Sequence, residues 1–167
     1  MIVIGLTGTI GAGKSTIIQW LADRGACVVD ADQLTREVQK PGESAYEAIV
    51  EAFGASILLS SGEIDRAALG AIVFADAERL QQLEAIVHPA VYARFAERVA
   101  VCSAPVLVLE AIKLLETGRL LPYCDEIWVV TVSEQVQLDR LLRERGMTVD
   151  EARRRIANQM GQEERVQ

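Results

Sequence analysis

The nine residues from Gly8 to Thr16 have the residue types and spacing of a phosphate-binding loop. Their sequence, GTIGAGKST, fits the pattern G-x-x-x-x-G-K-S/T. A polyphosphate needs several backbone N–H groups pointing into one concavity, and glycines allow the backbone angles and the close approach that this requires. A helix beginning at about Lys14 would turn its positive N-terminus toward the same anion.

This loop predicts a site for ATP and Mg²⁺. Lys14 is placed to reach the β- and γ-phosphates, and the Ser15 hydroxyl is placed to hold Mg²⁺. A chance match in a glycine-rich coil is disfavoured, because a strand precedes the loop and a helix follows it. A dinucleotide fingerprint is disfavoured too, because Thr16 stands where its third glycine is required. The predicted ATP-binding residues are Gly8, Gly11, Ala12, Gly13, Lys14, Ser15 and Thr16.

Two carboxylates follow the second apolar segment of the chain. Strand alternation predicts that Asp30 and Asp32 point roughly the same way, beside the phosphate loop. Such a carboxylate can accept a proton from an attacking hydroxyl, or hold Mg²⁺ through water. Alternatively, Asp32 only caps a helix that begins at Gln33.

Apolar runs and helix-stop residues predict the elements that position these groups. The first thirty residues indicate a βαβ unit, and residues 32–102 are mostly helical. The residue before a proline disfavours helix, so His88-Pro89 is expected to separate two helices. The predicted strands are Ile2–Thr7, Ala26–Val29, Pro105–Leu109 and Glu126–Val132, and the later helices begin after Ser133 and Thr148.

These strands are apolar on both faces, which is typical of a parallel sheet covered by helices on both sides. The predicted class is therefore α/β, a doubly wound fold with a three-layer core. Ligands of such sheets bind beyond the carboxyl ends of the strands, here Thr7, Asp30, Glu110 and Val132.

The composition of the chain excludes several classes of partner and of site. A net charge of −7 argues against nucleic acid as a partner, and no apolar run is long enough to predict a membrane span. The arginine-rich segment 134–167 suggests local anion handling, or a solvated helix with i,i+4 ion pairs. Cys27, Cys102 and Cys124 lack the spacing of a zinc or redox motif, so we expect buried, reduced thiols in a cytoplasmic protein.

The loop alone does not identify the reaction. Segments of the form N-K-x-D and D-x-x-G, which mark guanine-specific switches, are missing. Several motifs in order along the chain resemble the dephospho-CoA kinase family. They are Gly5–Thr16, Val28–Asp32, Gln39–Gly42, Phe53-Gly54, Phe74-Ala75, His88-Pro89 and the spacing of Gln135, Leu138 and Arg140.

The resemblance implies a Mg²⁺-dependent transfer of the ATP γ-phosphoryl group to the 3′-hydroxyl of dephospho-CoA. It implies a single P-loop kinase domain, 1–167, with an acceptor-binding region at 32–102 and a lid at about 134–160. Asp32 resembles the catalytic base, and Arg140 resembles the lid arginine that meets the transferring group, together with Lys14. Asp30 is a candidate Mg²⁺ ligand through water.

Several further residues have both a possible functional role and a possible structural role. His88 falls in the acceptor region or only holds a helix entry. Lys113 touches an acceptor phosphate or is a surface lysine. Gly146 and Gly161 are lid hinges or helix C-caps. Arg143 and Arg145 are expected to assist Arg140, depending on how their helix turns, and the arginines at 153–155 lie between the two glycines.

Two features depart from the family pattern. First, residues 110–116 have the sequence EAIKLLE, where the family often has Pro-Leu-Leu followed by an acidic residue. Second, the family normally continues with a further strand and helix, which carry an Ile-Asp-Asn stretch near the adenine, and the sequence does not contain them. The alternatives are another small-molecule or nucleoside monophosphate kinase of this fold, or a slow NTP-hydrolysing regulatory protein.

Overall fold

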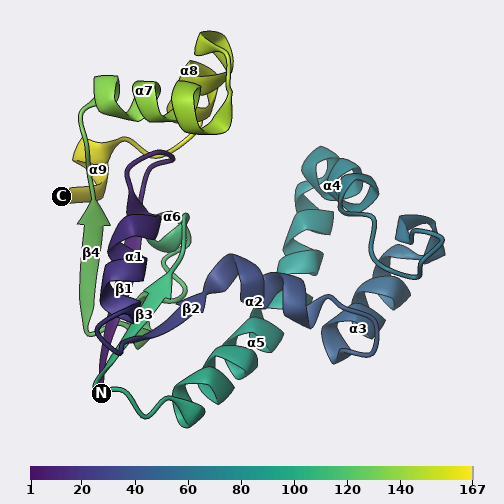
Figure 1. The fold of residues 1–167 in the computed structure, drawn as a ribbon. Coiled ribbons are helices and arrows are strands. Elements are labelled where there is room, and N and C mark those ends of the chain that lie inside the picture. The colour runs from purple at the N-terminus through teal and green to yellow at the C-terminus, as the bar shows by residue number, and fades with distance from the viewer. Residues whose placement is uncertain (167) are drawn as a thin grey trace. The chain divides into compact units, whose positions relative to one another are not determined.

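The structure, a computed structural model, describes residues 1–166 and divides them into two compact units. We call Met1–Asp30 together with the residues from Cys102 onward the sheet unit, and Ala31–Val101 the helical unit. Figure 1 shows the course of the chain through both.

The sheet unit contains four parallel strands in the order β2-β3-β1-β4, which confirms the predicted α/β class. The strands are β1 (Ile2–Gly8), β2 (Cys27–Asp30), β3 (Val106–Glu110) and β4 (Glu126–Val130). Leu6 of β1 lies opposite Glu110 of β3 and Trp128 of β4. The carboxyl ends of all four strands therefore share one edge of the sheet, where the glycine loop begins.

The core of the sheet unit explains why this segment folds as predicted. Leu6, Leu107 and Val108 are fully buried. Helix α1 (Lys14–Ala22) packs Leu21 against Leu6 and Val108. The removal of these side chains from water stabilises the crossover that carries the loop from β1 into α1.

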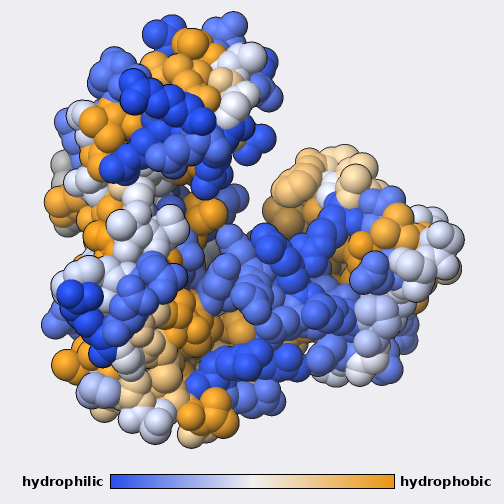
Figure 2. Space-filling model, in the orientation of Figure 1, coloured by the Kyte–Doolittle hydropathy of each residue, from blue (hydrophilic) through white to orange (hydrophobic). Residues whose placement is uncertain are grey.

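The remaining elements of the sheet unit follow β3 and β4. They are α6 (Leu114–Thr117), η2 (Leu121–Tyr123), α7 (Glu134–Arg145), α8 (Val149–Ala157) and α9 (Gln162–Val166). Figure 2 shows many hydrophilic residues over the visible face of α7 and α8. Ser133 caps α7, and Thr148 forms a capping box with Glu151 at the start of α8, as predicted.

The two glycines proposed as hinges or caps differ. Gly146 has φ 61° and ends α7 in the left-handed conformation, so it is a C-cap. Gly161 is not the C-cap of α8, because Asn158 takes that position and Gly161 precedes α9.

The helical unit is built from α2 (Ala31–Val38), α3 (Ser44–Phe53), η1 (Ala55–Ile57), α4 (Arg66–Ala75) and α5 (Ala77–Val101). It has its own apolar centre, in which Leu34, Ile49, Ile57 and Phe95 are buried. The described part of the chain contains no helix with both the length and the apolar character that a bilayer crossing needs.

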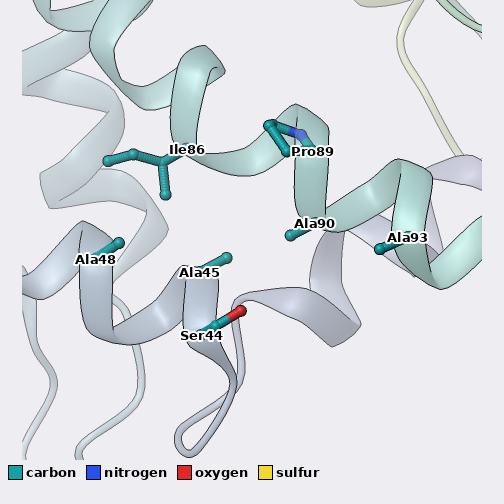
Figure 3. Close-up of a pocket in the computed structure, with 7 residues that line it drawn as sticks. All are labelled: Ser44, Ala45, Ala48, Ile86, Pro89, Ala90 and Ala93. Carbon is teal, nitrogen blue, oxygen red and sulfur yellow. The ribbon is translucent and has the colours of Figure 1, made fainter.

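The predicted break at His88-Pro89 is wrong. Helix α5 runs through it with Pro89 inside, and the ribbon turns at this residue (Figure 3). A proline inside a helix removes one backbone hydrogen bond and costs about 3 kcal/mol. Val87, Val91 and Phe95 are buried on either side of it, so their packing offsets that cost and keeps the helix continuous.

An ion-pair cluster on the surface of the helical unit joins α5 to α2 and α3. Arg94 lies 2.8 Å from Glu43 and 3.6 Å from Glu37, and Arg98 lies 2.9 Å from Glu37. The hydrogen bond from Arg98 lowers the pKa of Glu37, and the one to Glu43 raises the pKa of Arg94. These arginines are committed to holding the helices together.

The expectation of three reduced thiols is also wrong. Cys27 and Cys102 form a disulfide, and Cys124 is free and half-buried, with a pKa raised mainly by burial. Parallel strands start at one edge of a sheet, so the start of β2 and the segment before β3 are neighbours there. The pair is 75 residues apart in sequence, which is why no spacing motif indicated it.

The disulfide predicts a redox-dependent stability. Protein purified without reductant should show one thiol in denaturant, and reduction should lower the free energy of unfolding by about 2–4 kcal/mol, because the bond closes a long loop. Thiol titration and urea unfolding measure both. In the Cys102→Ser variant, added reductant should change nothing further. Three titratable thiols before reduction would contradict the assignment.

Candidate active site

The glycine loop between β1 and α1 has backbone angles and contacts that exclude side chains. Gly8, Gly11 and Gly13 have φ values of 150°, 75° and 98°. A Cβ on Gly8 would lie 2.5 Å from the Val130 carbonyl oxygen, and one on Gly13 would lie 2.9 Å from an Arg140 nitrogen. Position 8 therefore requires glycine for its φ and for its contact with backbone, whereas position 13 requires it for its φ, because the Arg140 side chain can shift.

Helix α1 begins directly after this loop, and its N-terminus has no side-chain cap. Gly13 is the N-cap residue and makes no side-chain hydrogen bond, so the first turn keeps donors that an anion can accept. Ser15 is exposed in that turn. The Lys14 ammonium donates to the carbonyl oxygens of Gly8 at 2.8 Å and Thr9 at 3.4 Å, which keeps its charge at the loop.

Helix α7 holds the loop from the other side. Gln137 donates to the Ile10 carbonyl oxygen at 2.5 Å, and Arg140 donates to the carbonyl oxygens of Gly11 and Ala12, each at 3.1 Å. The Ile10 N–H donates to Gln159 at 2.8 Å. The loop is thus tied through its own backbone to α7 and to the segment after α8, and the Arg140 guanidinium lies beside the glycine loop.

Thr9 is the exception in this network. Thr9 is only 3% exposed, and its buried hydroxyl has no hydrogen-bond partner among the described residues. An unsatisfied buried hydroxyl is costly. It borders a cavity of about 310 Å³ whose other lining residues are Glu134, Gln137, Ile156, Met160, Gly161, Gln162 and Glu163.

At the carboxyl edge of the sheet, a buried arginine pairs with a partly exposed glutamate. Arg165 of α9 is 4% exposed and donates to Glu116 at 2.5 Å. It also donates to the Thr7 hydroxyl and the Ile112 carbonyl oxygen, both at 3.2 Å. The charge-assisted bonds of Arg165 therefore fix α9 and α6 to the end of β1, next to the loop.

The two aspartates are not arranged as strand alternation predicted. Asp30 is the last residue of β2, opposite Glu110, whereas Asp32 is exposed in the first turn of α2. Helix α2 begins at Ala31, so the period-two argument does not reach Asp32. Asp32 also does not cap a helix from Gln33, because it is itself helical.

The other predicted residues are spread over both units. His88 lies on α5 with its ring stacked 6.4 Å from that of Tyr92, and Lys113 is the exposed N-cap residue of α6. Arg143 and Arg145 are exposed on α7, as are the arginines at 153–155 on α8. Arg140 is the arginine of these helices that the structure places on the loop.

Three contacts of this site were not predicted. The contact of Gln137 could have been predicted, because Gln137 lies three residues before Arg140 on the same face of α7 and Arg140 was already a candidate site residue. The contacts of Gln159 and of Arg165 with Glu116 could not. They join positions 49 or more residues apart, and no local pattern encodes such a contact.

Comparison with known proteins gives one consistent match. The dephospho-CoA kinase family model matches residues 2–167. The dephospho-CoA kinase of Streptomyces avermitilis is 46% identical over 99% of this chain and 81% of its own length. That of Geobacillus kaustophilus is 47% identical over 95% of this chain and 80% of its own.

Solved structures agree with this match. The crystal structure of the Thermus thermophilus protein TT1252 has a TM-score of 0.84 at 33% identity, and covers 99% of this chain and 83% of its own. The dephospho-CoA kinase from Campylobacter jejuni has a TM-score of 0.64 at 24% identity, over 93% of this chain and 78% of its own, and supports the fold.

A side chain at Gly8 tests the loop geometry. We expect Gly8→Ala to lower the free energy of unfolding by about 2 kcal/mol or more, since strain at positive φ adds to a clash with Val130. It should also weaken ATP binding strongly. The matched control is Gly25→Ala, where φ is 88° but nothing lies within 4 Å, so strain alone of about 1 kcal/mol is expected. Urea unfolding and ATP titration distinguish the two; equal losses would contradict the geometry.

Proposed function

We propose that this chain, a member of the dephospho-CoA kinase family, transfers the γ-phosphoryl group of ATP to the 3′-hydroxyl of dephospho-CoA and so completes coenzyme A synthesis. The chain belongs to that family, since the family model spans residues 2–167 and relatives are 46% identical over nearly its whole length. The observation that carries the proposal is the glycine loop with Lys14 and Arg140 gathered on it.

The phosphate groups of ATP fit the loop for a physical reason. The uncapped first turn of α1 supplies N–H donors, and Gly8, Gly11 and Gly13 remove the side chains that would block them. Lys14 is held by two carbonyl oxygens, so its ammonium can exchange them for phosphate oxygens without moving far. Ala12, Ser15 and Thr16 complete the binding segment.

Mg²⁺ fits the same end of the sheet. The Ser15 hydroxyl is exposed in the first turn of α1, and Asp30 ends the strand next to β3. The described residues hold no cluster of three or more acidic, histidine or cysteine side chains suited to a metal. Mg²⁺ usually takes one or two protein oxygens, with phosphates and water for the rest, so Ser15 and, through water, Asp30 are suitable. When bound, the ion neutralises phosphate charge.

The reaction needs little covalent work from the protein. The acceptor oxygen attacks the γ-phosphorus, the bond from that phosphorus to the β–γ bridging oxygen breaks, and ADP leaves. Asp32 accepts the hydroxyl proton, and Lys14 and Arg140 stabilise the charge on the transferring group.

The remaining predicted residues take supporting roles in this proposal. Residues 134–160 act as the lid, since α7 already bonds to the loop through Gln137 and Arg140. His88 and Lys113 contact the acceptor. Excluding water from the γ-phosphate is the physical reason for such a lid.

We also propose that the enzyme works in the cytoplasm, where ATP is made and used. Disulfides are rare in that compartment. The disulfide between Cys27 and Cys102 would then be one of the uncommon cases in that compartment.

Acceptor choice tests the function directly. In a coupled ADP-release assay with Mg²⁺, dephospho-CoA should support turnover, while AMP and water should give little. Rapid turnover with AMP would favour a nucleoside monophosphate kinase of the same fold. Slow release with water alone would favour a hydrolysing regulatory protein.

Arg140 should matter for the transition state more than for ATP affinity. We expect Arg140→Ala to lower kcat by about 10³-fold, which is typical of an arginine on a transferring phosphoryl group. The change in the ATP dissociation constant should be much smaller. Arg143→Ala is the matched control, because Arg143 is exposed on the same helix. Small changes in both constants of Arg140→Ala would remove Arg140 from the mechanism.

A further inference from the structure

A second polar cavity lies within the helical unit. Its volume is about 560 Å³, within the range of small-molecule sites. The lining comes from the end of α2, the turn that follows, and the start of α4. The lining residues are Arg36, Gln39, Lys40, Pro41, Leu59, Glu63, Ile64 and Arg66.

One wall of this cavity is a hairpin over residues 58–64 that is held firmly in place. Leu58 and Ile64 form an antiparallel bridge, and the Leu59 N–H donates to the Glu63 carbonyl oxygen at 2.8 Å. The Tyr46 hydroxyl donates to the Gly62 carbonyl oxygen at 2.5 Å. The Asp65 side chain then caps α4, which fixes the position of Arg66 in its first turn.

Three cations face one carboxylate in this lining. Within residues 1–166, Arg36, Lys40 and Arg66 have no side-chain hydrogen bond or ion pair, while Glu63 is the acidic member of the set. Other arginines of this unit do have partners: Arg94 and Arg98 bind glutamates, and Arg79 binds Gln82. All four side chains are exposed and therefore solvated, and an anion that enters the cavity would meet three cations and one carboxylate.

The neighbouring cavity of the same unit has the opposite character. It measures about 380 Å³ and lies between α3 and α5 (Figure 3). No residue that lines it is charged; they are Ser44, Ala45, Ala48, Ile86, Pro89, Ala90 and Ala93. Of these two cavities, only the first has charged residues in its lining, where Pro41, Leu59 and Ile64 add apolar contact.

Helix geometry aligns this cavity with the proposed base. Asp32, Arg36 and Lys40 are spaced four residues apart, and the Lys40 N–H bonds to the Glu37 carbonyl oxygen, so the turn continues past Val38. Within α2, Asp32 and Arg36 share one helix face, about 6 Å apart along the axis, and Lys40 lies in the turn that follows the helix. Figure 2 shows hydrophilic residues gathered over α2.

From this we infer that the cavity of Arg36, Lys40 and Arg66 binds the diphosphate of the acceptor nucleotide, an inference that rests on the proposed function. In dephospho-CoA the reactive ribose hydroxyl is only a few bonds from the 5′-diphosphate. A diphosphate bound by Arg36 and Lys40 brings that hydroxyl to the Asp32 end of the same helix face. Arg66 adds a donor from α4.

The test is the double variant Arg36→Gln, Arg66→Gln, assayed with wild-type protein and Mg·ATP. We expect its KM for dephospho-CoA to rise by about 10- to 100-fold, as for two lost hydrogen bonds to a charged group. The KM for ATP should change little. Calorimetry with dephospho-CoA alone should show a matching loss of affinity, whereas pantetheine, which lacks the diphosphate, should bind both proteins alike.

Two controls separate this effect from damage to the fold. Arg98→Gln removes one positive charge from the same unit outside the cavity and breaks the ion pair of Arg98 with Glu37 on α2, so it reports what a loss of helix packing alone does; it should leave the acceptor KM unchanged. Asp32→Asn should lower kcat and leave acceptor affinity in place. An unchanged acceptor KM in the double variant, or an equal rise in the ATP KM, overturns the inference while wild-type turnover upholds the kinase. Wild-type protein that fails to phosphorylate dephospho-CoA overturns both.

Discussion

The structure depends on one constraint: backbone amides at the start of α1 must converge with no side chain among them. Gly8 and Gly13 meet it at positive φ, and a Cβ on Gly8 would also collide with the Val130 carbonyl oxygen. Backbone polar groups that are not bonded to each other need other partners. The loop carbonyls find theirs in Lys14, Gln137 and Arg140, and its outward amides are left for phosphate.

This arrangement gives the cations of the sheet unit two uses. Lys14 and Arg140 donate hydrogen bonds to loop carbonyl oxygens in this structure, and the proposed function gives the same groups a second use, which is to neutralise phosphate charge. Arg165 is different, because it is buried, pairs with Glu116 and joins α9 and α6 to the end of β1. In the helical unit the division is similar: Arg94 and Arg98 join helices, while Arg36 and Arg66 line a cavity.

Local chemistry explains which expectations succeeded. The strands, the start of α1 at Lys14, the cap at Ser133 and the capping box of Thr148 all follow from residues within a few positions of each other. The failures arose where packing outweighed a local rule. Buried Val87, Val91 and Phe95 keep α5 continuous through Pro89, and an early start of α2 removes Asp32 from the alternation of β2.

By itself, the sequence determined the parallel sheet, the glycine loop and the family, because these rest on short patterns with strict steric and hydrogen-bonding requirements. Only the tertiary structure decided which side chains hold the loop, that Cys27 meets Cys102, that the buried Arg165 pairs with Glu116, and which arginines remain without partners around a cavity. The physical reason is separation along the chain. Such contacts form when strand order and helix packing bring distant residues together, and no local spacing encodes that order.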